Sequence, residues 1–244
     1  MSNGRVVWLA ESDPPGAFPP VTAALREPDG LLAAGGDLRT ARLLAAYRQG
    51  IFPWYDEGQP LLWWSPDPRC VIRAGDLRIP RRLRREIRRY PWEIRCNTDF
   101  GAVIGACAEP RRHQPGTWIT ADMRAAFERL HAEGWAHSIE VWLDGELAGG
   151  LYGLAIGRAL FGESMFSRRS NASKMALLFL DRLLSDGTFG ILDCQVRSRH
   201  LLSLGATTMP RAEFVARLAE LCDPAIAFED WPQGAVPVAD LLGR

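Results

Sequence analysis

The sequence has little of what membrane proteins, disulfide-stabilised proteins and metalloproteins need. No stretch of its 244 residues reaches about 18 uninterrupted apolar residues, so we expect no membrane span. The amino terminus lacks the basic and then apolar pattern of a secretory signal, which favours a cytoplasmic protein. The five cysteines and four histidines are scattered without metal-ligand spacing. We therefore expect reduced, buried thiols and neither a disulfide framework nor a zinc site.

Lysine is nearly missing, and the arginines that replace it are unevenly spread. Ten arginines and only three acidic residues lie between residues 69 and 95, although the whole chain is neutral. Six of these arginines fall within nine residues of one predicted helix, namely Arg81, Arg82, Arg84, Arg85, Arg88 and Arg89. Like charges repel one another and only Glu86 lies among them. The cluster therefore favours a surface for nucleic-acid phosphates over a solvated helix face.

Hydrophobic periodicity predicts an α+β protein with a boundary near residues 66–68. A short helix is expected over residues 41–49, capped by Thr40, and the aromatic- and proline-rich segment 51–69 is expected to hold no regular element. Beyond the boundary, residues 92–96 are strand-like, period-two alternation predicts strands over residues 137–143, 146–156 and 159–167, and residues 190–195 are expected to form a short buried strand. Further helices are predicted over residues 80–90, 100–108, 120–133, 172–185, 198–204 and 210–221. This order indicates a mixed sheet flanked by helices.

Glu163 is the first candidate for chemistry because it lies mid-strand among large apolar residues. A buried, unpaired carboxylate is costly, so Glu163 needs a partner or a polar cavity. An ion pair with Arg158 or Lys174 and a place in a functional site both satisfy this requirement. Strict alternation along the strand places Glu163 and Met165 on the same face.

A second candidate is the end of the buried strand at residues 190–195. Alternation directs Asp193 and Gln195 to one face and Cys194 to the other, so an acid and an amide can meet a substrate together. Asp193 can instead cap the following loop. Cys194 and His200 could form a nucleophile and base, although a core thiol is the commoner role for such a cysteine.

Four tryptophans lie in loops flanked by proline or threonine, namely Trp54, Trp63, Trp64 and Trp118. Each could stack on a nucleic-acid base or pack in the core, and we expect at least one to stack. A phosphate-binding loop, by contrast, is missing. Residues 167–174 (SRRSNASK) contain no glycine, whereas a coenzyme-A acetyltransferase of this topology needs a glycine-rich turn there to bind the pyrophosphate. Neither a Walker loop nor a dinucleotide fingerprint occurs elsewhere.

Eight motifs in order, between about residues 18 and 214, together resemble one family, the leucyl/phenylalanyl-tRNA–protein transferases. They are residues 30–38 (GLLAAGGDL), 50–54 (GIFPW), 63–69 (WWSPDPR), 116–120 (GTWIT), 137–142 (HSIEVW), 149–153 (GGLYG), 162–167 (GESMFS) and 193–195 (DCQ). Any one motif would be weak evidence, but eight in order are specific.

The resemblance implies a fold and a function. The fold is a small N-terminal domain, residues 1–67, joined to an acetyltransferase-like (GNAT) domain, residues 68–244, that has lost its coenzyme site. The function is transfer of leucine, phenylalanine and also methionine to proteins with N-terminal arginine or lysine, which marks them for degradation by the N-degron pathway. The implied partners are Leu-tRNA, Phe-tRNA and these acceptor proteins. Neither a cofactor nor a metal is implied, and a cytoplasmic monomer is expected.

The resemblance also assigns site residues by position. Glu163, Asp193 and Gln195 match the family's catalytic residues, and Trp54 and Trp118 match those that hold the terminal adenosine of tRNA. The arginine helix matches the acceptor-stem surface. The apolar wall of the amino-acid pocket would comprise Leu151, Leu160, Met165, Leu177, Leu180 and Leu192.

The expected chemistry follows from the aminoacyl ester, which is already activated and needs neither ATP nor a metal. The acceptor α-amino group, with a pKa near ~7.7–8.0, attacks the ester carbonyl. Asp193 is expected to orient Gln195, whose carbonyl holds the amine, because an amide is too weak a base to keep a proton. The proton can pass to Asp193 or to the ribose 2′-hydroxyl, and Glu163 can bind an ammonium or a guanidinium.

Three other functions stay open. A coenzyme-A acetyltransferase conflicts with the missing glycine turn. A transferase that builds cell-wall peptide bridges from charged tRNA would share the donor but use another amine. A non-catalytic RNA-binding module would leave the Glu163, Asp193 and Gln195 group without a role.

Overall fold

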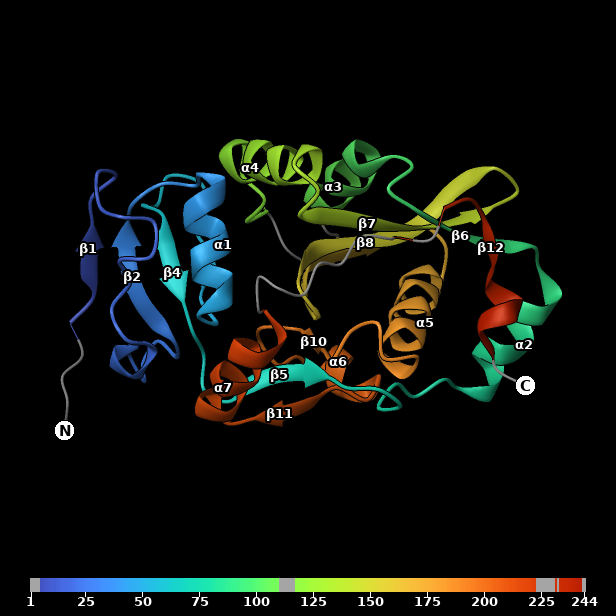
Figure 1. The fold of residues 1–244 in the computed structure, drawn as a ribbon. Helices are drawn as coiled ribbons and strands as arrows, with labels where there is room; N and C mark the ends of the chain where they lie inside the picture. Colours follow the sequence, from blue (N-terminus) through green and yellow to red (C-terminus); the bar gives the residue numbers. More distant parts are fainter. Residues whose placement is uncertain (1–4, 110–116, 223–230, 232, 243–244) are drawn as a thin grey trace.

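The computed structural model describes residues 5–109, 117–222, 231 and 233–242 and has a mixed α+β architecture, as predicted (Figure 1). One four-stranded sheet uses residues up to 64, and one eight-stranded sheet uses residues from 69 onward. Figure 1 shows the smaller sheet at one end of the molecule and the long strands of the larger sheet between layers of helices. No helix of the described part has the length and apolar composition needed to cross a bilayer.

The smaller sheet has the strand order β1-β2-β4-β3. Its elements are β1 (Val7–Leu9), η1 (Val21–Ala23), β2 (Leu31–Gly35), α1 (Thr40–Arg48), β3 (Phe52–Pro53) and β4 (Leu62–Trp64). The prediction of no regular element in residues 51–69 is wrong, since β3 and β4 both lie there. Both strands are very short, and Pro53 is tolerated because β3 is an edge strand, where its missing N–H leaves no ladder bond unmade.

The larger sheet has the order β11-β5-β10-β9-β8-β7-β6-β12. Its strands are β5 (Arg69–Ile72), β6 (Trp92–Cys96), β7 (Ala136–Leu143), β8 (Glu146–Ile156), β9 (Ala159–Ser167), β10 (Ile191–Asp193), β11 (Thr207–Met209) and β12 (Val236–Pro237). The predicted meander of β7, β8 and β9 is confirmed, and β9 and β10 form a parallel pair. Sequence analysis missed β5, β11 and β12, which are too short to show a periodicity.

The remaining helices cover the larger sheet and its ends. They are α2 (Arg81–Arg89), α3 (Phe100–Ala108), α4 (Ala121–Ala132), α5 (Ala172–Ser185), α6 (Arg199–Ser203), α7 (Arg211–Leu221) and η2 (Val238–Leu242). The side chains of Asp99, Thr120 and Ser198 each accept the N–H three residues later, as expected of N-caps. The predicted cap at Thr40 is wrong, because Thr40 is the first helical residue and the cap position belongs to Arg39.

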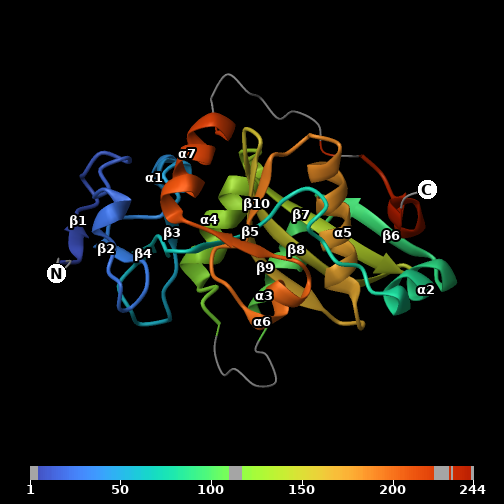
Figure 2. The same cartoon turned by 90° about the horizontal axis from the view of Figure 1, so that it is seen from below.

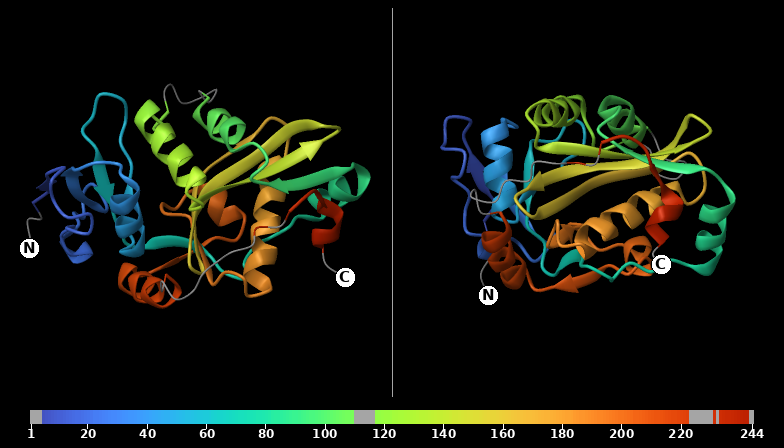
Figure 3. Two further views of the ribbon diagram at one scale, coloured as in Figure 1. Left: turned by 45° about the horizontal axis from the view of Figure 1, so that its top comes forward. Right: turned by 45° about the vertical axis from the view of Figure 1, so that its right-hand side comes forward.

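The larger sheet separates two apolar cores. Helices α3 and α4 pack on the face that carries Tyr152 and Leu154, whereas α5 packs on the face that carries Leu151 and Ala155. Figures 2 and 3 show α5 on the opposite side of β7 and β8 from α3 and α4. The first core continues into the smaller sheet through residues such as Trp63. The two sheets therefore share one core and are held as a unit.

A β-bulge interrupts the pairing of β8 with β9 at Glu163. Tyr152 pairs with Ser164 and Gly153 with Gly162, which leaves Glu163 with no residue opposite it. A Cβ at Gly153 would lie 2.1 Å from the Phe161 carbonyl oxygen, so the bulge requires glycine there. The extra residue interrupts the alternation of β9 side chains between the two faces of the sheet.

The bulge also overturns a sequence expectation. Glu163 contacts Tyr47, a member of the first core, whereas Met165 packs against the second core. The prediction that Glu163 and Met165 share a face is therefore wrong.

Candidate functional site

The centre of the candidate site is a buried ion pair between β5 and β10. Arg69 donates from Nε to Asp193 Oδ1 at 2.8 Å and from Nη2 to Oδ2 at 2.6 Å, so the pair is bidentate. Both side chains are 0% exposed. Arg69 also donates to the Gly50 carbonyl, and its guanidinium carbon lies 4.8 Å from the ring centroids of both Phe52 and Phe214. Such a pair is costly to bury and is tolerated because each nitrogen of the guanidinium and each oxygen of the carboxylate takes part in a hydrogen bond.

Asp193 in turn shapes the backbone of Gln195. The N–H of Gln195 donates to Asp193 Oδ1 at 2.8 Å, and Gln195 has a φ of 59°, a left-handed conformation that few non-glycine residues adopt. This bond helps to hold the strained turn at the end of β10. Both Asp193 oxygens are thus occupied by protein donors.

Gln195 and Tyr47 converge on the carboxylate of Glu163. The side-chain amide of Gln195 donates to Glu163 Oε1 at 2.8 Å, and the Tyr47 hydroxyl donates to the same oxygen at 2.7 Å. Glu163 Oε2 is buried and has no hydrogen-bond partner among the described residues. Burial raises the pKa of Glu163 to about 8, and the bond from Tyr47 opposes that rise. The site therefore holds one carboxylate oxygen fixed and leaves the other available.

The other partners considered for these residues lie elsewhere. Arg158 donates to the Gly187 carbonyl and Lys174 to the Asn171 side chain, so neither pairs with Glu163. Cys194 lies against Cys70 on the neighbouring strand, and this contact, together with burial, raises the pKa of the Cys194 thiol. A raised pKa disfavours the thiolate that a nucleophile needs.

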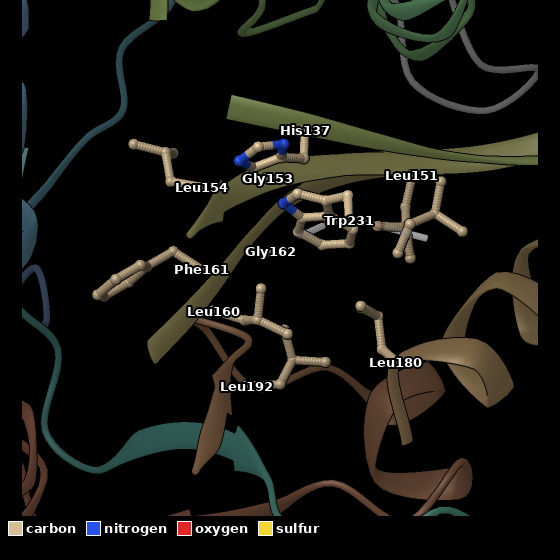
Figure 4. Close-up of a pocket in the computed structure, with 11 residues that line it drawn as sticks. His137, Leu151, Gly153, Leu154, Leu160, Phe161, Gly162, Leu180, Leu192 and Trp231 are labelled. Carbon is tan, nitrogen blue, oxygen red and sulfur yellow. The ribbon is translucent and has the colours of Figure 1, made fainter. Parts of the chain in front are cut away.

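An apolar pocket is lined by residues of β7, β8, β9, α5 and β10, together with Trp231 (Figure 4). Four of the six predicted wall residues line it, namely Leu151, Leu160, Leu180 and Leu192. Met165 and Leu177 do not line it, although both belong to or pack against the same core. Gly162, the neighbour of Glu163, also lines the pocket, so the cavity reaches the residue that precedes the bulged Glu163.

His137 and Trp231 complete the pocket wall, and neither was predicted. Their rings stack with centroids 4.5 Å apart, as Figure 4 shows. Burial lowers the pKa of His137 to about 4, so its ring is neutral at physiological pH. The wall therefore carries no charge, and the cavity of about 20 Å³ has room for roughly one water molecule.

The two tryptophans expected at the terminal adenosine come from segments that the fold brings together. Tyr55, next to Trp54, hydrogen-bonds through its hydroxyl to Thr120 at 3.2 Å, two residues beyond Trp118. Trp54 is 42% exposed, whereas Trp118 is partly buried against the first core. Gly116, the first residue of the Trp118 motif, lies outside the described residues. An exposed indole carried on a packed loop is suited to stacking.

The six arginines of α2 are all exposed, while Leu83 and Ile87 bury the opposite face of the helix. Within the described ranges, none of the six takes part in an ion pair, and Glu86 instead accepts a bond from Asn171 at the start of α5. The helix lies at the opposite end of the larger sheet from the smaller sheet (Figure 1). Its positive charge is therefore not neutralised by an ion pair with any residue that the structure describes.

Sequence reasoning missed Arg69, Tyr47, His137 and Trp231. Arg69 is the last residue of the motif at residues 63–69 and begins an apolar strand. An arginine in such a buried strand needs an acidic partner, and this requirement is the signal that could have identified it. Tyr47 carried no such signal, since periodicity marks it only as apolar and buried. The described residues contain no group of three or more His, Cys, Asp or Glu side chains that could hold a metal ion.

Comparisons with known proteins identify relatives of the chain. The family model described as leucyl/phenylalanyl-tRNA protein transferase matches residues 71–219, and the model of that family's N-terminal domain matches residues 36–67. The chain is 59% identical over 214 residues to the leucyl/phenylalanyl-tRNA–protein transferase of Aromatoleum aromaticum, with 88% of this chain and 89% of that protein covered. It is 53% identical over 218 residues to the transferase of the same name from Pseudomonas aeruginosa, with 89% and 96% covered.

Proposed function

The chain belongs to the family of leucyl/phenylalanyl-tRNA protein transferases, and from this premise we infer which donor, acceptor and residues it uses. It is an aminoacyltransferase that takes leucine or phenylalanine, and also methionine, from charged tRNA. The acceptor is the α-amino group of a protein that begins with arginine or lysine, and the transfer marks that protein for degradation. The observation that carries this proposal is an apolar pocket that reaches Gly162, the residue before a buried carboxylate with one oxygen that no described residue hydrogen-bonds. Charged tRNA is a cytoplasmic molecule, so the proposal implies a cytoplasmic enzyme.

The proposed mechanism gives each polar residue one task. Asp193, with both oxygens occupied, holds Gln195 in its strained turn and does not take the proton. Since the Gln195 N–H₂ group donates to Glu163, its carbonyl is left to accept from the attacking amine. The free oxygen of Glu163 binds the acceptor ammonium. Its pKa of about 8 matches the ~7.7–8.0 of an α-amino group, which suits a general base.

Proton balance requires two transfers from the acceptor ammonium. The first proton passes to Glu163 and then to solvent, which frees the nitrogen lone pair. The neutral amine attacks the ester carbonyl, the new C–N bond forms and the ester C–O bond breaks. The second proton passes from this nitrogen to the departing 3′-oxygen of the ribose, through the adjacent 2′-hydroxyl. No external energy source enters, because the ester is the activated species.

We propose that the larger sheet and its helices form an acetyltransferase-like domain that works without a coenzyme. We propose that this domain begins near residue 68, because the chain passes from one sheet to the other between Trp64 and Arg69. The parallel strands β9 and β10 are joined by α5, whose N-terminus is where a pyrophosphate would be expected. There the Ser173 N–H donates to Ser167 Oγ at 3.0 Å, so the chain itself uses this donor. That contact weighs against coenzyme-A binding.

A direct transfer assay tests the function. Purified protein is mixed with Leu-tRNA carrying labelled leucine and with peptides that begin with arginine or, as the matched acceptor, alanine. We expect label only on the arginine peptide, without ATP. Tight, salt-sensitive tRNA binding without transfer would instead support the RNA-binding or cell-wall alternatives.

We expect the arginine surface to set the salt dependence of tRNA binding. The logarithm of the tRNA association constant K falls linearly with the logarithm of the salt concentration. Each phosphate contact removed should make this line less steep by about one unit of slope. Arg85→Gln combined with Arg88→Gln should therefore flatten the slope by about two, as measured by filter binding between low and physiological salt. Arg124→Gln, which removes an exposed helical arginine from α4, should leave the slope unchanged. Equal slopes in all three proteins would remove α2 from the binding surface.

Trp231 is expected to limit the size of the donor side chain. The cavity is too small for a leucyl group until the wall moves, and Trp231 is its bulkiest member. Trp231→Ala should raise transfer of phenylalanine relative to leucine several-fold, since apolar pockets discriminate by about 1–3 kcal/mol per methylene. The ratio of kcat/KM for the two donors measures this effect. The control is Trp8→Ala, which removes a 69% exposed indole on β1 and should leave the ratio unchanged. An unchanged ratio in Trp231→Ala would show that Trp231 does not limit the size of the donor side chain.

A further inference from the structure

The hydroxyl of Tyr47 reaches the site from helix α1 and meets the carboxylate that we assign to the reaction. Tyr47 lies on α1, beside the smaller sheet, whereas Glu163 lies in the bulge of β9 in the larger sheet. The two side chains are joined by a 2.7 Å hydrogen bond across 116 residues of sequence. We propose that Tyr47 is a positioning residue of the transfer reaction, which holds Glu163 so that its second oxygen is left for the acceptor ammonium. This inference rests on the role proposed above for Glu163.

Tyr47 is itself held rigidly. Its side chain is 0% exposed, and its ring packs edge-on against Phe161 with centroids 5.1 Å apart and an interplanar angle of 66°. Because the ring cannot swing, the position of its hydroxyl is fixed relative to β9. A fixed donor determines where a flexible glutamate carboxylate comes to rest.

Both protein donors select the same oxygen of Glu163. Tyr47 and Gln195 each donate to Oε1, at 2.7 and 2.8 Å, and Oε2 receives no bond from the described residues. If Tyr47 and Gln195 had bonded different oxygens of Glu163, the acceptor ammonium would have to share either oxygen with a protein donor. Two donors on one oxygen fix the terminal torsion of Glu163 and leave the other oxygen open.

The segment that carries Tyr47 also reaches the other parts of the site. Three residues later the Gly50 carbonyl accepts from Arg69, the partner of Asp193. Four residues beyond Gly50 is Trp54, the proposed platform for the terminal adenosine. A single stretch of eight residues, 47–54, thus contacts the carboxylate and the buried ion pair and carries the tryptophan proposed to hold the terminal adenosine. The part of the chain before β5 is therefore expected to contribute to the chemical step as well as to tRNA binding.

The test compares Tyr47→Phe with Tyr152→Phe. Tyr152 is the matched control, because it is equally buried, packs edge-on against Phe100 and Phe127, and has a hydroxyl without a hydrogen-bond partner among the described residues. Single-turnover transfer from saturating Leu-tRNA to an arginine peptide should slow about tenfold in Tyr47→Phe and remain within about twofold in Tyr152→Phe. The pH optimum should move to higher pH only in Tyr47→Phe, since the lost bond is one that lowers the pKa of Glu163.

A double-mutant cycle with Glu163→Gln separates positioning from mere structure. If Tyr47 acts through Glu163, then adding Tyr47→Phe to Glu163→Gln should cause no further loss of rate. A loss that is equal at every pH and persists in the Glu163→Gln background would overturn the inference. So would a wild-type rate and pH optimum in Tyr47→Phe.

The outcome also distinguishes this inference from the function on which it rests. If Glu163→Gln itself transfers at the wild-type rate, the proposed role of Glu163 fails and that of Tyr47 fails with it. If Glu163→Gln is impaired while Tyr47→Phe is not, only the inference about Tyr47 is lost.

Discussion

Replacing Asp193 with asparagine is expected to remove most transfer activity and to lower the free energy of unfolding by about 3–5 kcal/mol. The reason is that Arg69, with a 0% exposed guanidinium, would lose the one ion-pair partner that it has among the described residues. Breaking a buried ion pair at one end leaves an uncompensated charge and costs that amount. Chemical denaturation measures the stability, and single-turnover transfer of labelled leucine measures the activity. An Asp193→Asn protein with wild-type stability and rate would contradict the arrangement described above.

Three further variants separate the stabilising role of this pair from its role in positioning. Arg69→Met combined with Asp193→Leu removes both charges and should recover much of the stability but none of the transfer. Gln195→Ala keeps the ion pair and should lose transfer with little loss of stability. Glu128→Gln removes a partly exposed ion pair on α4 and should change stability by less than about 1 kcal/mol. Recovery of transfer in the charge-free double variant would show that Asp193 has no positioning role.

Replacing Glu163 with glutamine is expected to slow transfer by about 10²–10⁴-fold, the range of a lost general base, and to change the shape of the pH profile. In the wild type, kcat/KM should fall below pH 8, because Glu163 with a pKa of about 8 becomes protonated and cannot bind the acceptor ammonium. It should also fall above that pH, because the acceptor α-amino group, with a pKa of ~7.7–8.0, loses its proton and no longer forms an ion pair with the Glu163 carboxylate. The profile is therefore a bell with its maximum near pH 8.

Glu163→Gln should lack that maximum. Only the neutral amine can then react, so kcat/KM should rise with the deprotonation of the acceptor and level off at alkaline pH. The profile is best measured with a single arginine peptide under single-turnover conditions, with spontaneous ester hydrolysis subtracted at each pH. Ser164→Ala, one residue away on β9, serves as the matched control and should retain the bell. If the Glu163→Gln variant kept a bell-shaped pH profile, groups other than Glu163 and the acceptor amine would cause the fall in kcat/KM on both sides of the maximum.

The sequence predicted the elements whose pattern is local. The long strands β7, β8 and β9 alternate and are separated by turn residues, and α3, α4 and α6 begin at side chains that cap them. The exposed arginines of α2 were evident because charge density is itself a sequence property. Family motifs point to Asp193, Gln195 and Glu163, and four of the five predicted wall leucines line one cavity, whereas the one predicted methionine does not. The roles of these residues stay predictions until the variants are measured.

What the tertiary structure decided is how distant residues meet. Periodicity could not reveal that the bulge turns Glu163 away from Met165, because a single unpaired residue inverts the faces without altering the composition of the strand. It also could not show that Arg69 neutralises Asp193 across 124 residues, or that Tyr47 reaches Glu163 from helix α1. Local sequence determines which backbone conformations and which buried faces are favourable. Long-range pairing of buried charges and donors determines the site, because the energy of each partner depends on a residue that only folding brings near.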